Sequence, residues 1–93
     1  MNYTVFNNSS APVVLIYDGT GFEEALSACV FATDLPTESY TIKRFLDGEL
    51  NKSADIWRVA SSIPMRTKID GVTKSWETAT AAKDEIRLQF SAI

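Results

Sequence analysis

Histidine is absent from the 93 residues of this chain, and cysteine occurs once, at Cys29. The absence of histidine removes the commonest general base and the commonest metal ligand from any site. A single cysteine allows no internal disulfide, and it leaves too few ligands for a structural zinc site. We therefore expect no catalytic residue, metal or cofactor, and we expect that the protein is not an enzyme. The lone thiol is typical of a reducing compartment, which indicates the cytoplasm.

Long apolar runs are also missing from the chain. No stretch approaches the roughly 18 consecutive apolar residues that are needed to span a bilayer. The first residues, Met1-Asn2-Tyr3-Thr4, show no basic segment ahead of an apolar one, so we expect neither a signal peptide nor a membrane partner. Hydrophobic residues make up 45% of the chain, which is enough to form the core of one domain over residues 1–93.

Basic residues are missing from the first 42 positions, which contain five acidic ones. Residues 43–93 hold all nine basic residues and seven acidic ones, and the whole chain has a net charge of −3. Charge that is segregated in this way indicates an oriented interaction surface, although small proteins also acquire such an imbalance by drift.

A weak internal repeat relates residues 3–33 to residues 55–90. Ser9-Ser10-Ala11-Pro12 and a later Asp18-Gly19 match Ser61-Ser62-Ile63-Pro64 and a later Asp70-Gly71. Each copy predicts two strands joined by a serine-rich turn, then an Asp-Gly corner, then a helix. We therefore expect an α+β fold built from two hairpin–helix units, with a mostly antiparallel sheet of about five strands and two helices on one face.

The strands of this sheet are predicted by β-branched and alternating segments at residues 3–6, 13–17, 40–45, 56–60 and 65–69. The run Val13–Tyr17 is apolar throughout, which is typical of a strand buried on both faces. The first hairpin is therefore expected inside the sheet and the second nearer an edge. Asp47-Gly48 predicts a hairpin turn.

The helices are predicted by capping patterns. Thr20 and Glu23 form a capping box that opens a first helix, which should end near Thr33. Ser75 is the expected cap of a second helix over residues 76–90, although the end of this range also alternates as a strand would. The helices are expected to contribute Phe22, Leu26, Cys29, Trp76, Ala79 and Ile86 to a core against Val13, Leu15, Trp57 and Val59.

The second hairpin carries the chain's most distinctive surface. In its later strand Arg66 and Lys68 alternate with apolar residues, which gives one apolar and one basic face. We expect Arg58 to lie beside these two cations near Trp57, and Lys74 to join them. Basic side chains around an aromatic ring suit phosphate contact and base stacking. Solvent-exposed charge that discourages edge-to-edge aggregation is the alternative interpretation.

The leading hypothesis for function is a non-enzymatic protein-binding domain. Such a domain would dock its acidic first half, with Glu23, Glu24 and Asp34, on a basic partner, or its basic hairpin on an acidic one, and block that surface. In profile the chain is similar to small accessory proteins of bacteriophages and mobile elements, including inhibitors of host defence proteins. Nucleic-acid binding by the basic hairpin is the alternative. Binding of a small anion such as a nucleotide at the two Asp-Gly corners is a third hypothesis, and the sequence leaves monomer and homodimer open.

Overall fold

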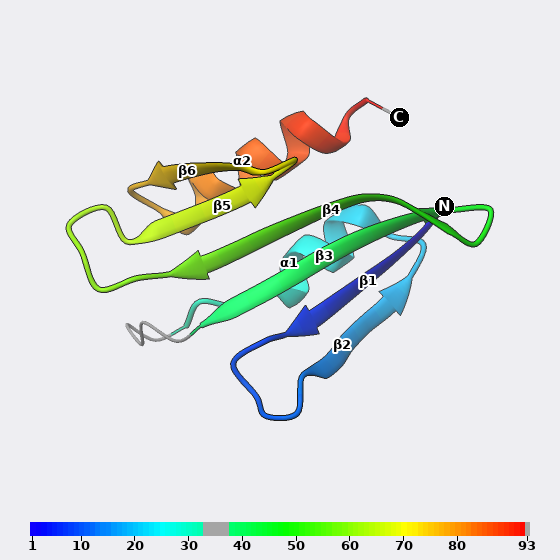
Figure 1. Cartoon of the computed structure of the whole chain (residues 1–93), viewed down its shortest axis with the longest axis horizontal. Helices are drawn as coiled ribbons and strands as arrows, with labels where there is room; N and C mark the ends of the chain where they lie inside the picture. Colours follow the sequence, from blue (N-terminus) through cyan, green and yellow to red (C-terminus); the bar gives the residue numbers. More distant parts are fainter. Residues whose placement is uncertain (33–37, 93) are drawn as a thin grey trace.

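The structure, a computed structural model, describes residues 1–32 and 38–92 as six strands and two helices. Along the chain these elements are β1 (Asn2–Asn7), β2 (Val14–Gly19), α1 (Phe22–Ala28), β3 (Ser39–Leu46), β4 (Glu49–Arg58), β5 (Met65–Ile69), β6 (Val72–Trp76) and α2 (Ala79–Phe90). The strands pair antiparallel in the order β2-β1-β3-β4-β5-β6. Both helices lie behind the sheet in Figure 1. The expected α+β fold is confirmed, with six strands rather than about five.

The core lies between the sheet and the helices. Helix α1 packs on β1 and β2, whereas α2 packs on β4, β5 and β6. Alternation along each strand selects the buried side chains, as in β5, where Met65, Thr67 and Ile69 are buried and Lys68 is exposed. The alternation predicted for this strand is confirmed. The largest apolar side chains that are almost fully enclosed are Val5, Leu26, Ile42, Ile56, Met65 and Ile86.

Two Asp-Gly pairs form tight hairpin turns. Asp47 and Gly48 have φ values of 51° and 82°, and Asp70 and Gly71 have φ values of 53° and 79°. Two successive residues with positive φ are typical of the type I′ turn, whose twist matches that of the strands it joins. The hairpin predicted at Asp47-Gly48 is confirmed.

The turn at Asp70-Gly71 leads into β6 and not into a helix, so the expectation of a helix from residue 76 with a cap at Ser75 is wrong. Because the turn reverses the chain within two residues, the following segment continues the sheet by pairing with β5. Helix α2 begins at Ala79, where the hydroxyl of Thr78 accepts a hydrogen bond from the amide of Ala81 over 3.1 Å. The end of the range 76–90, for which the sequence allowed a helix or a strand, is helical up to Phe90.

The first hairpin lies at the edge of the sheet, so the expectation that it is inside is wrong. Among the described strands β2 pairs only with β1, and Val13 and Leu15 are exposed instead of covered by helices. In β4 the expected face is also inverted, because Ile56 points to the helices and Trp57 to the other face. Leu15 is exposed because it pairs with Phe6 and points away from the helices, whereas Tyr17 is the β2 side chain that packs on the core.

The beginning of α1 also differs from the sequence prediction. Its N-cap is Gly21 and makes no side-chain capping bond, so the capping box at Thr20 is wrong. The amide of Gly21 donates instead to the hydroxyl of Tyr17 over 3.0 Å. The carboxylate of the exposed Glu24 occupies the space beside Gly21, so a side chain at this position would require that of Glu24 to move. The helix ends at Ala28, and the end expected near Thr33 lies outside the described residues.

Candidate functional site

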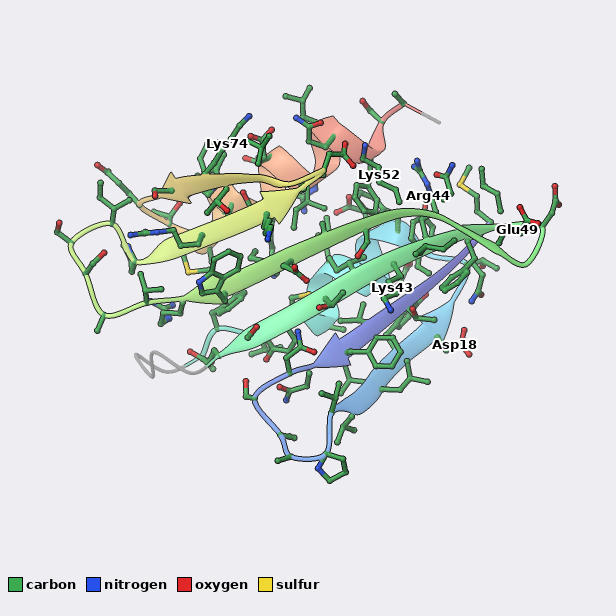
Figure 2. The ribbon with its side chains drawn as sticks, viewed as in Figure 1. Asp18, Lys43, Arg44, Glu49, Lys52 and Lys74 are labelled. Atoms are coloured by element: carbon green, nitrogen blue, oxygen red, sulfur yellow. The ribbon has the colours of Figure 1, made fainter. Side chains whose placement is uncertain are left out.

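One face of the sheet has no other element packed on it among residues 1–32 and 38–92 (Figure 1). Figure 2 shows this face, with Lys43 projecting from β3 across it. Strand alternation and register bring side chains from five strands together here, namely Thr4, Phe6, Leu15, Thr41, Lys43, Asp55, Trp57, Arg66 and Lys68. We call this surface the uncovered face. It mixes aromatic and charged side chains.

Three residues that the sequence singled out meet on the uncovered face. Trp57 pairs directly with Arg66 across β4 and β5, and Lys68 follows Arg66 on the same side of the strand. The guanidinium of Arg66 donates to the carbonyl oxygens of Ile63 and Met65, which ties this side chain to the loop between the two strands. We call Trp57, Arg66 and Lys68 the aromatic–basic cluster. It offers a flat ring and two cations side by side, and one of the cations is held in place.

A second group on the uncovered face lies over β1 and β3. The ammonium of Lys43 sits 5.4 Å from the centre of the Phe6 ring, a cation–π contact. Next to it a shallow groove of about 260 Å³ is lined by Phe6, Val13 and Lys43 together with Asn8 and Thr41. The aromatic rings and cations on this face therefore form two groups, one at each side of the sheet's centre.

A short polar chain lies between these two groups. Asn8 donates to the hydroxyl of Thr41 over 2.8 Å, and that hydroxyl donates to the carboxylate of Asp55 over 2.7 Å. Asp55 pairs in register with Lys68. The face thus carries negative as well as positive charge, and a partner must match both.

Arg58 and Lys74 do not belong to the uncovered face, so the expectation that they join Arg66 and Lys68 is wrong. Both lie on strand positions that point toward the helices. The guanidinium of Arg58 lies over the Phe31 ring, and its Nε is 3.4 Å from a carboxylate oxygen of Glu38. Its charge is thereby neutralised within the fold.

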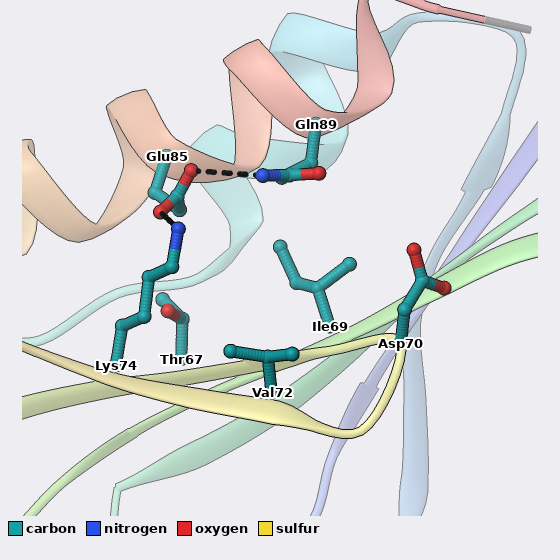
Figure 3. Close-up of a pocket in the computed structure, with 7 residues that line it drawn as sticks. All are labelled: Thr67, Ile69, Asp70, Val72, Lys74, Glu85 and Gln89. Atoms are coloured by element: carbon teal, nitrogen blue, oxygen red, sulfur yellow. Dashed lines mark hydrogen bonds and ion pairs between the residues drawn. The ribbon is translucent and has the colours of Figure 1, made fainter.

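Lys74 forms the polar wall of a pocket between α2 and the β5–β6 hairpin (Figure 3). Its ammonium lies 2.7 Å from the carboxylate of Glu85, which also accepts a hydrogen bond from the amide of Gln89 over 3.2 Å. The hydrogen bond from Lys74 holds the pKa of Glu85 below its ordinary value. The pocket measures about 150 Å³, and its other lining residues are Thr67, Ile69, Asp70 and Val72. Because the charges of Lys74 and Glu85 neutralise each other, we interpret the pair as a structural link between α2 and β6.

The acidic candidates of the first half are partly engaged. Glu23 accepts three hydrogen bonds from the guanidinium of Arg87, the shortest of 2.9 Å, so this ion pair links α1 to α2. Hydrogen bonding to Arg87 lowers the pKa of Glu23. Glu24 is exposed beside Gly21. Asp34 lies outside the described residues. Only Glu24 of this group is an unengaged carboxylate in the described part of the chain.

Arg44 is the residue that sequence reasoning missed. It is 1% exposed, and its guanidinium donates to Asn51 over 2.7 Å, to the Phe90 carbonyl over 2.7 Å and to the Ala92 carbonyl over 2.9 Å. It also lies over the Phe90 ring. A cation at the carboxyl end of a helix interacts favourably with the helix dipole. The sequence did contain a signal, because Arg44 alternates with Tyr40 and Ile42, both of which are buried.

The remaining sequence candidates show no reactive group. Burial raises the pKa of the Cys29 thiol to about 12, so the thiolate is scarce at neutral pH. Among the described residues no cluster of three cysteine, aspartate or glutamate side chains could hold a metal ion. The second Asp-Gly corner is a hairpin turn ahead of β6, so the expected pair of corners before helices does not form. Neither helix in the described ranges is long and apolar enough to cross a membrane.

No protein-family model, no curated protein and no solved structure matches this chain. Its function therefore has to be inferred from the arrangement of its own side chains.

Proposed function

We propose that the protein is a non-enzymatic protein-binding domain that docks the uncovered face of its sheet on an acidic surface of a partner protein. The observation that carries the proposal is the aromatic–basic cluster of Trp57, Arg66 and Lys68 on a sheet face that no described helix covers. Tryptophan and arginine are the residues that contribute most to binding energy at protein interfaces. By occupying its partner's surface, such a domain blocks that surface sterically, which is how a small phage accessory protein would inhibit a host protein.

Charge supports an acidic partner. Lys43, Arg66 and Lys68 lie on the uncovered face, and none of these three cations has an ion-pair partner within the described residues. Arg58 and Lys74, which point to the other face, are already paired, and the buried Arg44 donates to neutral acceptors within the fold. The unpaired cations available to an acidic surface therefore include those on the uncovered face. Opposite electrostatic potentials on the two proteins favour their association and fix their orientation.

Nucleic-acid binding is the second candidate, because an aromatic ring between cations on a bare antiparallel sheet also suits single strands. Two features favour a protein partner instead. Asp55 sits within the uncovered face, so a partner must offer a donor or a cation to Asp55 as well as acidic groups to the cations, and a uniformly anionic phosphate backbone does not. The chain as a whole carries a net charge of −3, whereas nucleic-acid-binding domains are strongly basic as a rule.

Affinity purification of the tagged protein from bacterial lysate, with and without nuclease, tests the proposal. We expect a stoichiometric protein partner that survives nuclease and is lost from the triple variant W57A/R66A/K68A. The control K52A/K83A removes two cations outside the cluster and should retain the partner. A variant E23A/E24A tests docking through the acidic half in the same way.

Two results would contradict the proposal. Loss of the partner on nuclease treatment, with binding to single-stranded DNA that weakens steeply as salt rises, would favour nucleic acid. Retention of the protein partner by the triple variant would move the docking surface away from the cluster. Localisation in the cytoplasm, which the single buried thiol supports, is part of the same proposal.

A further inference from the structure

Strand β2 presents an exposed apolar edge. Among residues 1–32 and 38–92 it pairs only with β1, so the other side of its backbone has no neighbouring strand from the described part of the chain. Val13, Val14, Leu15 and Ile16 are 53%, 45%, 47% and 39% exposed, respectively. No charged residue occurs from Ser9 to Tyr17. Natural edge strands usually carry charges or are covered, because an apolar edge pairs readily with another chain.

The opposite edge of the sheet is built differently. In β6 the apolar Val72 is followed by Thr73, Lys74 and Ser75, and Lys74 is fastened to α2. A polar strand with a lysine along it discourages pairing with another strand. The two edges of the sheet are therefore not equivalent, and only β2 lacks this protection.

The apolar surface of β2 extends onto the uncovered face. Leu15 pairs with Phe6 across β1 and β2, and Val13 lines the groove next to Phe6. The register between β1 and β2 shifts at Ile16, which has no partner on β1 and remains partly exposed. Another molecule that pairs with β2 would therefore cover apolar side chains along the edge and on the adjoining face. This gives it more buried area than a backbone edge alone.

We propose that β2 pairs antiparallel with β2 of a second copy of this chain, so that the sheet continues through a two-fold symmetric homodimer. Pairing centred between Leu15 and Ile16 sets Val14 against Tyr17 and Val13 against Asp18. The two Asp18 carboxylates then lie at opposite ends of the interface. Parallel pairing in register would place these carboxylates side by side, at a cost in repulsion.

Charge also makes a second copy a suitable occupant. The paired run from Val14 to Tyr17 is neutral in both copies, and the two Asp18 carboxylates lie apart at opposite ends of the interface, so two identical acidic molecules meet without like charges facing each other. The polar β6 edges remain on the outside of the pair, which closes the assembly at two copies instead of extending it. This inference is independent of the protein-binding proposal, because it concerns the purified chain alone.

Sedimentation velocity of the purified full chain, from about 1 to about 100 μM, tests the dimer over the range expected for a small interface. We expect a reversible monomer–dimer equilibrium in the wild type. Leu15→Lys places a charge on the exposed edge and should raise the dimer dissociation constant at least about tenfold. Val72→Lys, at a similarly exposed apolar residue on the other edge, is the matched control and should leave the dimer unchanged.

Hydrogen exchange of the β2 amides gives a second measurement that does not depend on a variant. Protection of amides between Val14 and Asp18 should rise with protein concentration, whereas protection in β6 should not. A wild type that stays monomeric up to the highest concentration would overturn the proposal, as would a dimer that Leu15→Lys leaves intact. Growth into larger assemblies would overturn the closed two-fold pairing. A monomer whose partner from the lysate is lost in Leu15→Lys but retained by W57A/R66A/K68A would overturn the dimer and make β2 the edge for a different protein.

Discussion

Lys74 and Glu85 join the edge strand β6 to helix α2 through an ion pair of 2.7 Å. Glu85 is almost fully buried, whereas Lys74 remains about half exposed. The strand and the helix are separated by only two residues, so this contact closes the hairpin–helix unit onto itself. Gln89 completes the set of hydrogen bonds around the carboxylate.

This ion pair should make stability depend on pH. The pKa of Glu85 is depressed in the folded state from its ordinary value of 4.5. Its contribution to stability is therefore fully present above pH 4.5 and is lost as the pH falls through the depressed folded value. We expect Glu85→Gln to lower the urea midpoint at pH 7, with the gap to the wild type closing as the pH falls below 4.5 and through the depressed folded value. A gap that is independent of pH would contradict the assigned role.

Arg44 should be one of the most sensitive positions for stability. Arg44→Ala removes three hydrogen bonds and leaves the Phe90 carbonyl without this donor. We expect a loss of about 3 kcal/mol in the free energy of unfolding, measured with urea. Lys68→Ala removes an exposed cation from the sheet and serves as control, with an expected change within about 0.5 kcal/mol. Equal effects of the two variants on the free energy of unfolding would contradict the role assigned to the hydrogen bonds of Arg44.

Cys29 should report on unfolding. Because burial raises the pKa of its thiol to about 12, we expect almost no reaction with a disulfide reagent at pH 8 in the native protein. In urea the thiol should react fully and at the rate of a free cysteine. Rapid labelling of the native protein would show that α1 opens readily. A parallel measurement of circular dichroism separates such local opening from global unfolding.

Gly71 should be required for the turn between β5 and β6. Its φ of 79° lies in the left-handed region, and a Cβ atom there would meet no atom within 4 Å. The cost of Gly71→Ala is therefore conformational, about 1 kcal/mol in the free energy of unfolding. Gly71→Asn should cost less, since asparagine tolerates this region better than alanine does. Thermal unfolding of the two variants would measure the difference, and the reverse order would contradict it.

Sequence patterns predicted the parts of the fold that local chemistry determines. Asp47-Gly48 specifies its turn through positive φ values, and the alternation from Met65 to Ile69 specifies which side is buried. The position of β2 could not be predicted, because an apolar run reads the same at the centre of a sheet and at an edge. Trp57 was placed on the wrong face because it and Ile56 are both apolar neighbours in one strand.

The candidate site was predicted in part. Trp57, Arg66 and Lys68 were selected together and do lie together. Arg58 and Lys74 point to the opposite face of the sheet. Side chains alternate along a strand, so a shift of one residue in the expected alternation moves each side chain to the other face. The carbonyl partners of Arg44 are 46 and 48 residues away along the chain, so no local pattern indicates them.

The same separation has a consequence for the order of events during synthesis. Strand β3 leaves the ribosome long before residues 90 and 92, whose carbonyl oxygens receive the guanidinium of Arg44. Until then the cation has only Asn51 as a nearby acceptor and stays hydrated, which opposes burial of that end of β3. The nascent sheet can therefore complete its packing only after translation has passed the end of α2.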